Sequence, residues 1–209
     1  GGVLRTYRLA VAVTAEYTQV YGGGTVNGAL AALTTTINTV NAIYERDLSI
    51  RLMLVANETN VIFTNTTSDG YTSDVADTMF DQNQSILDSR IGAGNYDIGH
   101  VFDGHTGVSS GHFFFQGRAA LASVCVGGLK GKGVSIFRSL EPNSVNAAFV
   151  VAHEMGHQFG ASHTFNGTTT SDCLNGRAGA TAVEPGTGST IMAYRGSSGT
   201  GYGYFNLCG

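Results

Sequence analysis

Hydrophobic and polar positions follow two different periods along the chain. Short apolar or alternating runs, which are typical of β-strands, predict strands at residues 5–13, 49–55, 96–102, 119–126 and 133–137. Apolar residues spaced three or four apart predict helices at residues 25–46, 74–91 and 144–159. We expect Asp74 to cap the start of the second helix and Gly160 to end the third.

The order of these elements predicts the fold class. Strands and helices alternate over most of the chain, which favours an α/β domain with a mixed, mostly parallel twisted sheet. Beyond Gly160 the sequence is mostly Gly, Thr, Ser and Asn and shows little periodicity. We therefore expect a single domain over residues 1–209, with an N-terminal subdomain at 1–160 and an irregular, coil-rich C-terminal subdomain at 161–209.

Composition excludes several classes of function. Hydrophobic residues make up 42% of the 209 positions, but no apolar run approaches the ~20 residues of a membrane span. The net charge is −4 and no basic cluster occurs, so we expect neither membrane insertion nor nucleic acid as a partner. Charged residues make up only 12%, about half of the usual ~25%, and a surface of small polar residues favours a secreted protein.

Three cysteines, Cys125, Cys173 and Cys208, allow one disulfide in an oxidising compartment and leave one thiol. A disulfide between Cys173 and Cys208 would cross-link and stabilise the C-terminal subdomain, which has little apolar core of its own. The chain begins with Gly-Gly-Val, so we expect it to be a processed piece of a longer protein.

Residues 153–163 carry the pattern HExxHxxGxxH. Four residues along a helix rotate by about 400°, a net 40°, so His153 and His157 project from one face, one turn apart. Gly160 allows a sharp turn with positive φ, which would bring His163 back as a third nitrogen ligand. The spacing therefore predicts a zinc site made of three histidines.

The same pattern predicts a catalytic site and not a structural one. Three neutral imidazoles leave the fourth position of a tetrahedral zinc ion open for water. Glu154 leaves the helix at a different angle from His153 and can reach that water without displacing an imidazole.

The eleven-residue motif is the metzincin signature, and the chain resembles the metzincin zinc endopeptidases, in particular the bacterial reprolysin-like, adamalysin-related enzymes. Met192, in the run Ser-Thr-Ile-Met-Ala-Tyr at 189–194, matches the methionine-containing turn of that clan. The resemblance covers nearly the whole chain and rests also on the segments 5–10, 43–48, 95–102 and 163–167.

This resemblance implies a metzincin fold with an active-site helix and a secreted zinc endopeptidase acting on extended protein or peptide substrates. His153, His157 and His163 would bind one catalytic Zn²⁺, and Glu154 would serve as general base for a zinc-activated water and then as the acid for the leaving amine. Met192 would form a hydrophobic floor beneath the metal. An inhibitory pro-segment upstream of the chain and a monomeric enzyme are also expected.

Two residues depart from the adamalysin pattern. Thr164 follows the third histidine where animal adamalysins have Asp, and the run His163-Thr164-Phe165 is closer to the pappalysin branch. Tyr194 lies two residues after Met192, as does a tyrosine near the metal in several related families. It is a candidate donor to the transition-state oxyanion, and a purely packing role is the alternative.

The resemblance also suggests where substrate and further ions would bind. An extended substrate should pair with an edge strand, for which we expect residues 119–126. Calcium is a further possibility, with Asp97, Asp103 and Asp172 as candidate ligands. By analogy with adamalysins, Cys125–Cys208 is the alternative disulfide.

Two other functions stay open. One is a catalytically inactive, metzincin-like binding or adhesion module, which the intact Glu154 and the three histidines oppose. The other is a peptidase of the pappalysin branch.

Overall fold

The computed structural model describes residues 2–105, 116–137 and 145–194. The chain divides into two compact units, Gly1–Phe159 and Gly160–Gly209. The first unit contains a sheet with helices on both faces, so the expected α/β class with a mixed, mostly parallel sheet is confirmed.

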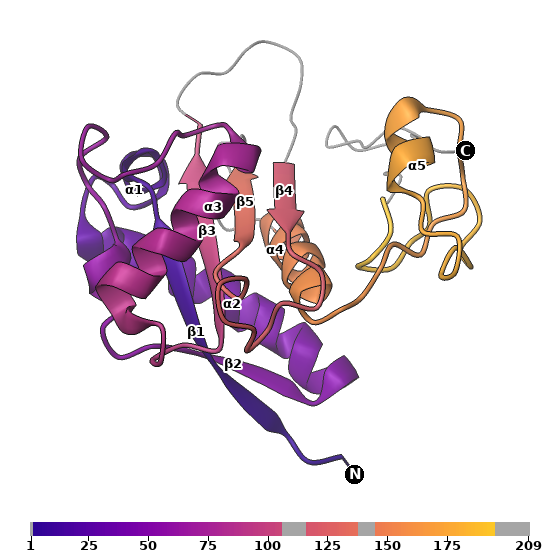
Figure 1. Cartoon of the computed structure of the whole chain (residues 1–209), viewed down its shortest axis with the longest axis horizontal. Helices are drawn as coiled ribbons and strands as arrows, with labels where there is room; N and C mark the ends of the chain where they lie inside the picture. Colours follow the sequence, from indigo (N-terminus) through magenta and orange to yellow (C-terminus); the bar gives the residue numbers. More distant parts are fainter. Residues whose placement is uncertain (1, 106–115, 138–144, 195–209) are drawn as a thin grey trace. The chain divides into compact units, whose positions relative to one another are not determined.

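Within the described residues the sheet has the strand order β2-β1-β3-β5-β4 (Figure 1). Its strands are β1 (Arg5–Val13), β2 (Ile50–Leu54), β3 (Ile98–Gly104), β4 (Gln116–Ala119) and β5 (Gly133–Phe137). The first three pairings along this order are parallel, and β4 alone runs antiparallel to its neighbour β5. Strands β2 and β4 therefore form the two edges.

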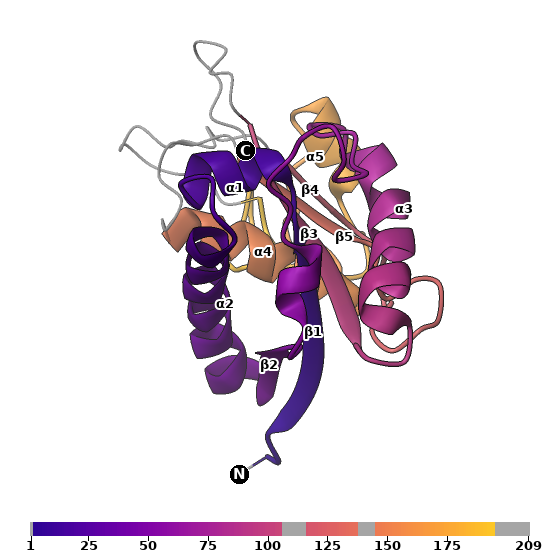
Figure 2. The same cartoon turned by 90° about the vertical axis from the view of Figure 1, so that its left-hand side faces the viewer.

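Helices cover both faces of this sheet. Helices α2 (Val26–Leu48) and α4 (Val145–Gln158) pack on each other on one face, and α3 (Ala76–Leu87) lies on the other (Figure 2). A short helix, α1 (Ala15–Tyr21), follows β1 directly, with Thr14 as its N-cap. Burial on both faces explains why the central strands have nearly continuous apolar sequences.

Strand β1 illustrates this two-sided burial. Ala10 and Ala12 belong to the core beneath α3, together with Met79 and Leu87 of that helix region. The alternate residues of the strand, among them Val11, are also fully buried. Because successive side chains of a strand point to opposite faces, both faces of β1 lie inside the protein over residues 9–13.

Most of the elements expected from periodicity are confirmed, with shifted ends. The strands at 5–13, 49–55, 96–102 and 133–137 and the helix at 25–46 all form. The helix expected at 74–91 begins at Ala76, and Asp74 is not its cap: Asp74 has a φ of 65° and donates its backbone N–H to an Asp103 carboxylate oxygen at 2.7 Å. The expected first residue of the third helix, Ser144, lies outside the described residues.

The strand expected at 119–126 is wrong. The edge strand is β4, and the chain beyond Ala119 forms successive turns in which Ala122 and Cys125 have positive φ. The N–H groups of Ala122 and Ser123 donate to carbonyls at the end of α4, so they are used to cap a helix and not to pair strands.

The second unit is less irregular than its composition suggests. Its described part, residues 160–194, contains a short helix, α5 (Ser171–Gly176), whose N-cap Thr170 accepts the N–H of Cys173 at 3.3 Å. Phe165, Cys173 and Ala193 form a small buried core, against which Tyr194 packs. Periodicity could not reveal α5 because one and a half turns are too short to show a period.

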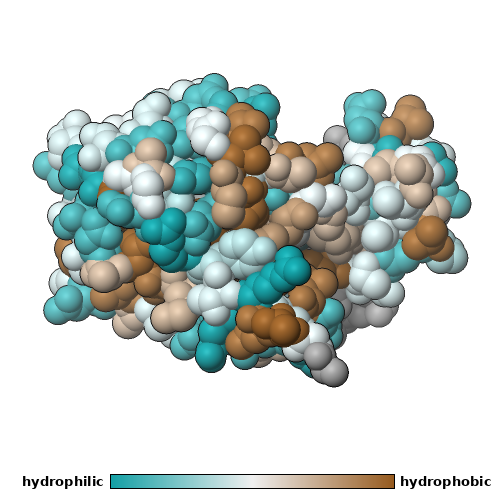
Figure 3. Space-filling model, turned by 60° about the horizontal axis from the view of Figure 1, so that its bottom comes forward, coloured by the Kyte–Doolittle hydropathy of each residue, from teal (hydrophilic) through white to brown (hydrophobic). Residues whose placement is uncertain are grey.

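In the described part of the chain, no helix is long and apolar enough to cross a membrane. Large hydrophobic side chains reach the surface at several described positions, among them Leu48 and Met53. On the face shown in Figure 3 the hydrophobic side chains lie in separate patches among hydrophilic ones. Isolated exposure of this kind is normal for globular proteins.

Glu58 is a buried carboxyl group next to β1. Its side chain is 4% exposed, and its Oε1 accepts the backbone N–H of Val11 at 2.7 Å. Its Oε2 has no hydrogen-bond partner among the described residues. Burial raises the pKa of Glu58 to about 8, against one hydrogen bond that lowers it, so the folded protein holds this group as the neutral acid at neutral pH.

Replacing Glu58 with Gln should therefore change the pH dependence of stability. The unfolded chain ionises this carboxyl near pH 4.5, whereas the folded chain keeps its proton up to about pH 8. The free energy of unfolding of the wild type should fall across this window relative to Glu58→Gln, by up to roughly 5 kcal/mol at ~1.4 kcal/mol per pKa unit. Urea unfolding of both proteins between pH 4.5 and 8.5 measures this difference, with Glu45→Gln, at a half-buried glutamate, as the control. A difference that stays constant with pH would contradict the assignment.

Candidate metal centre

Helix α4 carries the first two histidines of the motif on neighbouring turns. The rings of His153 and His157 lie 4.7 Å apart and perpendicular to each other, and their Nε2 atoms are 3.1 Å apart. Tetrahedral zinc with Zn–N distances of ~2.0–2.1 Å separates its ligand nitrogens by about 3.3 Å. The spacing of four residues therefore produces the geometry expected from the sequence.

The end of α4 is fixed to the sheet by Gln158, the residue after His157. Its side-chain amide donates to the carbonyl of Gly99 at 3.0 Å, and its Oε1 contacts Nδ1 of His100 at 3.1 Å. The other nitrogen of His100 contacts the Ser135 hydroxyl at 2.9 Å. Burial lowers the pKa of His100 to about 4, so this histidine is a neutral part of the core.

Further hydrogen bonds hold α4 along its length. The Tyr44 hydroxyl, from α2, donates to the carbonyl of Ala152 at 2.6 Å. The N–H groups of Ala122 and Ser123 donate to the carbonyls of His157 and Gln158, both at 2.9 Å. The two backbone contacts satisfy carbonyls that a helix end leaves open, and all three contacts help to fix the position of the two histidines.

Glu154 points toward the edge strand. Its side chain is 7% exposed, and a Cβ atom added at Gly117 of β4 would overlap it. Burial raises the pKa of Glu154 to about 8. A divalent cation nearby would lower this pKa, because an opposite charge favours the carboxylate. The group can therefore accept and release a proton near neutral pH.

His163 belongs to the second unit and is oriented by α5. Gly160 has a φ of 98°, as the motif predicts, so the chain turns where a side chain would be strained. The Nδ1 of His163 lies 2.5 Å from the carbonyl oxygen of Gly176, at the end of α5. A carbonyl only accepts, so Nδ1 carries the proton and Nε2 keeps its lone pair for a metal. Burial lowers the pKa of His163, which also favours the neutral ring.

Aromatic side chains pack around this ring. Tyr194 stacks on Phe165 with ring centroids 4.4 Å apart, and it contacts His163 edge-on at 4.7 Å. A Cβ added at Gly176 would lie 2.7 Å from the Tyr194 hydroxyl oxygen. Tyr194 thus lies beside the third histidine, as its spacing from Met192 suggests.

Met192 lies in a turn, as its sequence context predicts. The N–H of Ala193 donates to the carbonyl of Thr190 at 3.2 Å and closes this turn. The carbonyl of Met192 accepts the N–H of Thr164 at 3.1 Å, which joins the turn to the residue that follows His163.

The three histidines form the metal site that the described residues offer. The nitrogen atoms that His153, His157 and His163 can present to a metal all lie within 4.8 Å of one another. Three imidazole nitrogens with no carboxylate among them suit zinc better than calcium or magnesium, which prefer oxygen. The donor set therefore fits a zinc ion.

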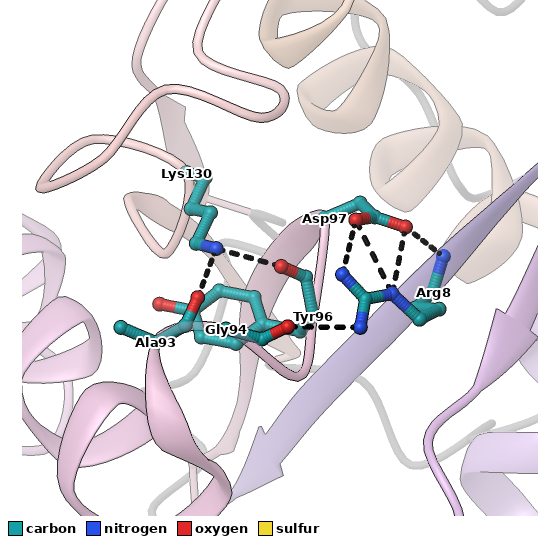
Figure 4. Close-up of polar contacts among 6 residues, drawn as sticks. All are labelled: Arg8, Ala93, Gly94, Tyr96, Asp97 and Lys130. Atoms are coloured by element: carbon teal, nitrogen blue, oxygen red, sulfur yellow. Dashed lines mark hydrogen bonds and ion pairs between the residues drawn. The ribbon is translucent and has the colours of Figure 1, made fainter.

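The acidic residues considered for calcium do not converge. The Asp97 carboxylate accepts hydrogen bonds from the backbone and the guanidinium of Arg8, at 2.7 to 3.3 Å (Figure 4). These hydrogen bonds, above all from the side chain, lower the pKa of Asp97. Asp103 accepts from the Thr14 hydroxyl at 2.6 Å, at the far end of β3. The side chain of Asp172 lies outside the described residues.

The cysteines differ in environment. Cys125 is exposed and carries a free thiol, which argues against the alternative pairing Cys125–Cys208. Cys173 is fully buried in the core of the second unit. Cys208 lies outside the described residues.

Sequence reasoning missed two residues that contact the site. Gln158 adjoins the motif but is not part of it, and Gly117 lies in a glycine-rich stretch. Their roles depend on partners far away in the chain, and no local pattern carries that information.

Comparison with known families agrees with this geometry. Residues 3–207 match the model of the reprolysin-like metallopeptidases of family M12B. A comparison with curated proteins found no match. Because the family model covers nearly the whole chain, this protein belongs to the reprolysin-like M12B metallopeptidases, which are zinc-dependent.

Proposed function

We propose that this protein is a secreted zinc endopeptidase of the metzincin clan that cleaves extended protein or peptide substrates. The observation that carries the proposal is the convergence of His153, His157 and His163, with Glu154 one residue from the first of them. A bound zinc ion would supply Lewis acidity, which lowers the pKa of water and polarises the scissile carbonyl.

Glu154 would act as the general base and then as the acid. Its carboxylate takes the proton of the attacking water and returns a proton to the leaving amine. Burial against β4 supports this role because a desolvated carboxyl exchanges protons closer to neutral pH than an exposed one. No side chain acts as nucleophile, so no acyl-enzyme forms.

Substrate would bind as an additional strand along β4. Within the described residues β4 pairs with β5 only, which leaves its other side available for main-chain hydrogen bonds. Gly117 of β4 contacts Glu154, so a peptide on this edge would bring its scissile bond to the base.

The proposal also covers the domain organisation, the oligomeric state, the inhibitory segment and the disulfide of this protein. We propose one catalytic domain over residues 1–209, a monomer, and an upstream pro-segment as inhibitor. The proposed disulfide Cys173–Cys208 is supported by the burial of Cys173 and the free thiol of Cys125. Calcium gains no support from the described residues, because Asp97 pairs with Arg8.

Two alternatives are separated from the proposal by simple measurements. An inactive binding module would bind zinc but cleave no protein, whereas the endopeptidase cleaves casein and stops when a chelator removes zinc. A pappalysin-branch peptidase, suggested by the run 163–165, would cleave the same generic substrate. A profile of cleavage sites in a peptide library would show whether the sequence preference of this protein matches that of reprolysin-like enzymes or that of the pappalysin branch.

Replacing Glu154 with Gln should abolish most activity and keep zinc. The amide cannot accept a proton, so kcat should fall by roughly 10²–10⁴-fold. Zinc content by atomic absorption and the circular dichroism spectrum should match the wild type. Glu45→Gln, which replaces a half-buried glutamate on α2 that pairs with Arg51, is the matched control. A Glu154→Gln protein that cleaves as fast as the wild type would refute the general-base assignment.

Replacing Gly117 with Ala should displace the Glu154 carboxylate without unfolding the protein. The added methyl group overlaps a flexible side chain, which can move away. A displacement of about 1 Å at a reacting group can lower kcat by roughly 10²-fold. Gly127→Ala is the control, because a Cβ at Gly127 meets no atom within 4 Å. Equal turnover of the two variants, with equal zinc content, would show that β4 does not position Glu154.

Replacing Tyr194 with Phe separates its two candidate roles. Phe keeps the stacking on Phe165 and the contact with His163 but removes the hydroxyl. If the hydroxyl stabilises the oxyanion, kcat should fall by roughly 10²-fold or more while zinc content stays the same. An unchanged kcat would assign Tyr194 to packing.

A further inference from the structure

Glu184 of the second unit accepts hydrogen bonds from two separate segments. Its Oε2 accepts the N–H of Ser189 at 2.6 Å and the N–H of Thr190 at 3.1 Å. Its Oε1 accepts the hydroxyl groups of Thr164 and Thr190 in short hydrogen bonds. One carboxylate thus joins residues that lie 20 positions before it and five to six positions after it.

Both segments adjoin residues assigned to the proposed metal site. Thr164 directly follows His163, the third histidine of the motif, and Ser189 and Thr190 lead into the turn at Met192. Glu184 therefore connects the segment that carries a proposed zinc ligand to the turn associated with it.

Backbone hydrogen bonds also join Glu184 to the segment that follows His163. The N–H of Glu184 donates to the carbonyl of Thr164 at 2.9 Å, and its carbonyl accepts the N–H of Asn166 at 2.8 Å. Gly188 has a φ of 73°, and a Cβ there would lie 3.0 Å from the Glu184 carboxylate and closer still to Ala193. The turn therefore approaches the carboxylate at a position where only glycine fits well.

Glu184 is an anion in this setting. Burial acts to raise the pKa of Glu184, but the hydrogen bonds from Thr164, Thr190 and Ser189 outweigh it and lower the pKa to about 2. No ion pair between described residues involves this carboxylate, so its charge is stabilised by hydroxyl and backbone donors. A charged acceptor makes stronger hydrogen bonds than a neutral amide, which explains why a glutamate stands there.

We propose that Glu184 is a positioning residue that holds the His163 segment and the Met192 turn together, so that the third zinc ligand is in place before the metal binds. This role rests on the proposed zinc site. It goes beyond that site because Glu184 is not one of the three histidines that would hold the metal. Residues that orient ligands from outside the coordination shell typically change metal affinity by 10–100-fold when they are replaced.

The test measures metal affinity directly. Replacing Glu184 with Gln keeps the size of the side chain but removes its charge and half of its accepting capacity. Competition with a chromophoric chelator should show zinc affinity lowered by about 10–100-fold. In the cobalt-substituted protein, the visible absorption bands should change, because they report ligand geometry. Glu184→Asp keeps the charge on a shorter side chain, so its zinc affinity should lie between that of the wild type and that of Glu184→Gln.

Controls separate positioning from general destabilisation. Glu45→Gln should match the wild type in zinc affinity and cobalt spectrum. Thr164→Val removes one donor and should weaken zinc binding less than Glu184→Gln; if Glu184→Gln does not fold, Thr164→Val carries the test. A folded Glu184→Gln protein with a lower melting temperature but unchanged zinc affinity and cobalt spectrum would overturn the proposal. If only Thr164→Val folds, unchanged zinc affinity in that variant would overturn it as well.

The same data distinguish this proposal from the proposed function. A wild-type protein that binds zinc but cleaves nothing contradicts the endopeptidase, and the affinity comparison still decides on Glu184. If the wild type cleaves protein and Glu184→Gln binds zinc as tightly as the wild type, only the positioning role is contradicted. A wild-type protein that binds no zinc overturns both.

Discussion

Two imidazole nitrogens held 3.1 Å apart on one helix are the constraint on which the rest of this structure depends. Such an arrangement is useful only if the helix cannot shift, because a metal accepts its ligands within a few tenths of an ångström. Helix α4 is accordingly fixed at its end by Gln158, along its length by Tyr44, and at its last carbonyls by the turn at Ala122. The sheet and α2 provide the rigid surface for these contacts.

The third histidine depends on a different kind of support. Among its described residues, 160–194, the second unit has a core of only a few buried side chains, so hydrogen bonds and turns there do much of what apolar packing does in the first unit. The carbonyl of Gly176 selects the tautomer of His163, and Tyr194 and Phe165 pack around its ring. A charged hydrogen-bond acceptor such as Glu184 suits a region where hydrophobic burial contributes little.

Three glutamates show how environment assigns different chemistry to one side chain. Glu58 and Glu154 are buried with few donors, and desolvation raises the pKa of each to about 8. Glu184 is surrounded by hydroxyl and N–H donors, and its pKa falls to about 2. The first kind of site holds or exchanges a proton, and the second keeps a permanent charge.

The sequence by itself determined the metal site, the active-site helix and most of the sheet. The motif at 153–163 works through helical spacing and one glycine turn, and both are local properties that a sequence displays directly. The strands of the buried sheet were predictable because burial on both faces requires continuous apolar runs.

Only the tertiary structure decided how the site is supported and where its edge strand lies. The apolar run at 119–126 forms turns because the end of α4 takes its N–H groups. Gln158 contacts Gly99, Gly117 contacts Glu154, and Glu184 contacts Thr164, and these partners lie between 20 and 59 positions apart. Contacts between such distant positions depend on how the chain folds back on itself, and no local sequence pattern records that path.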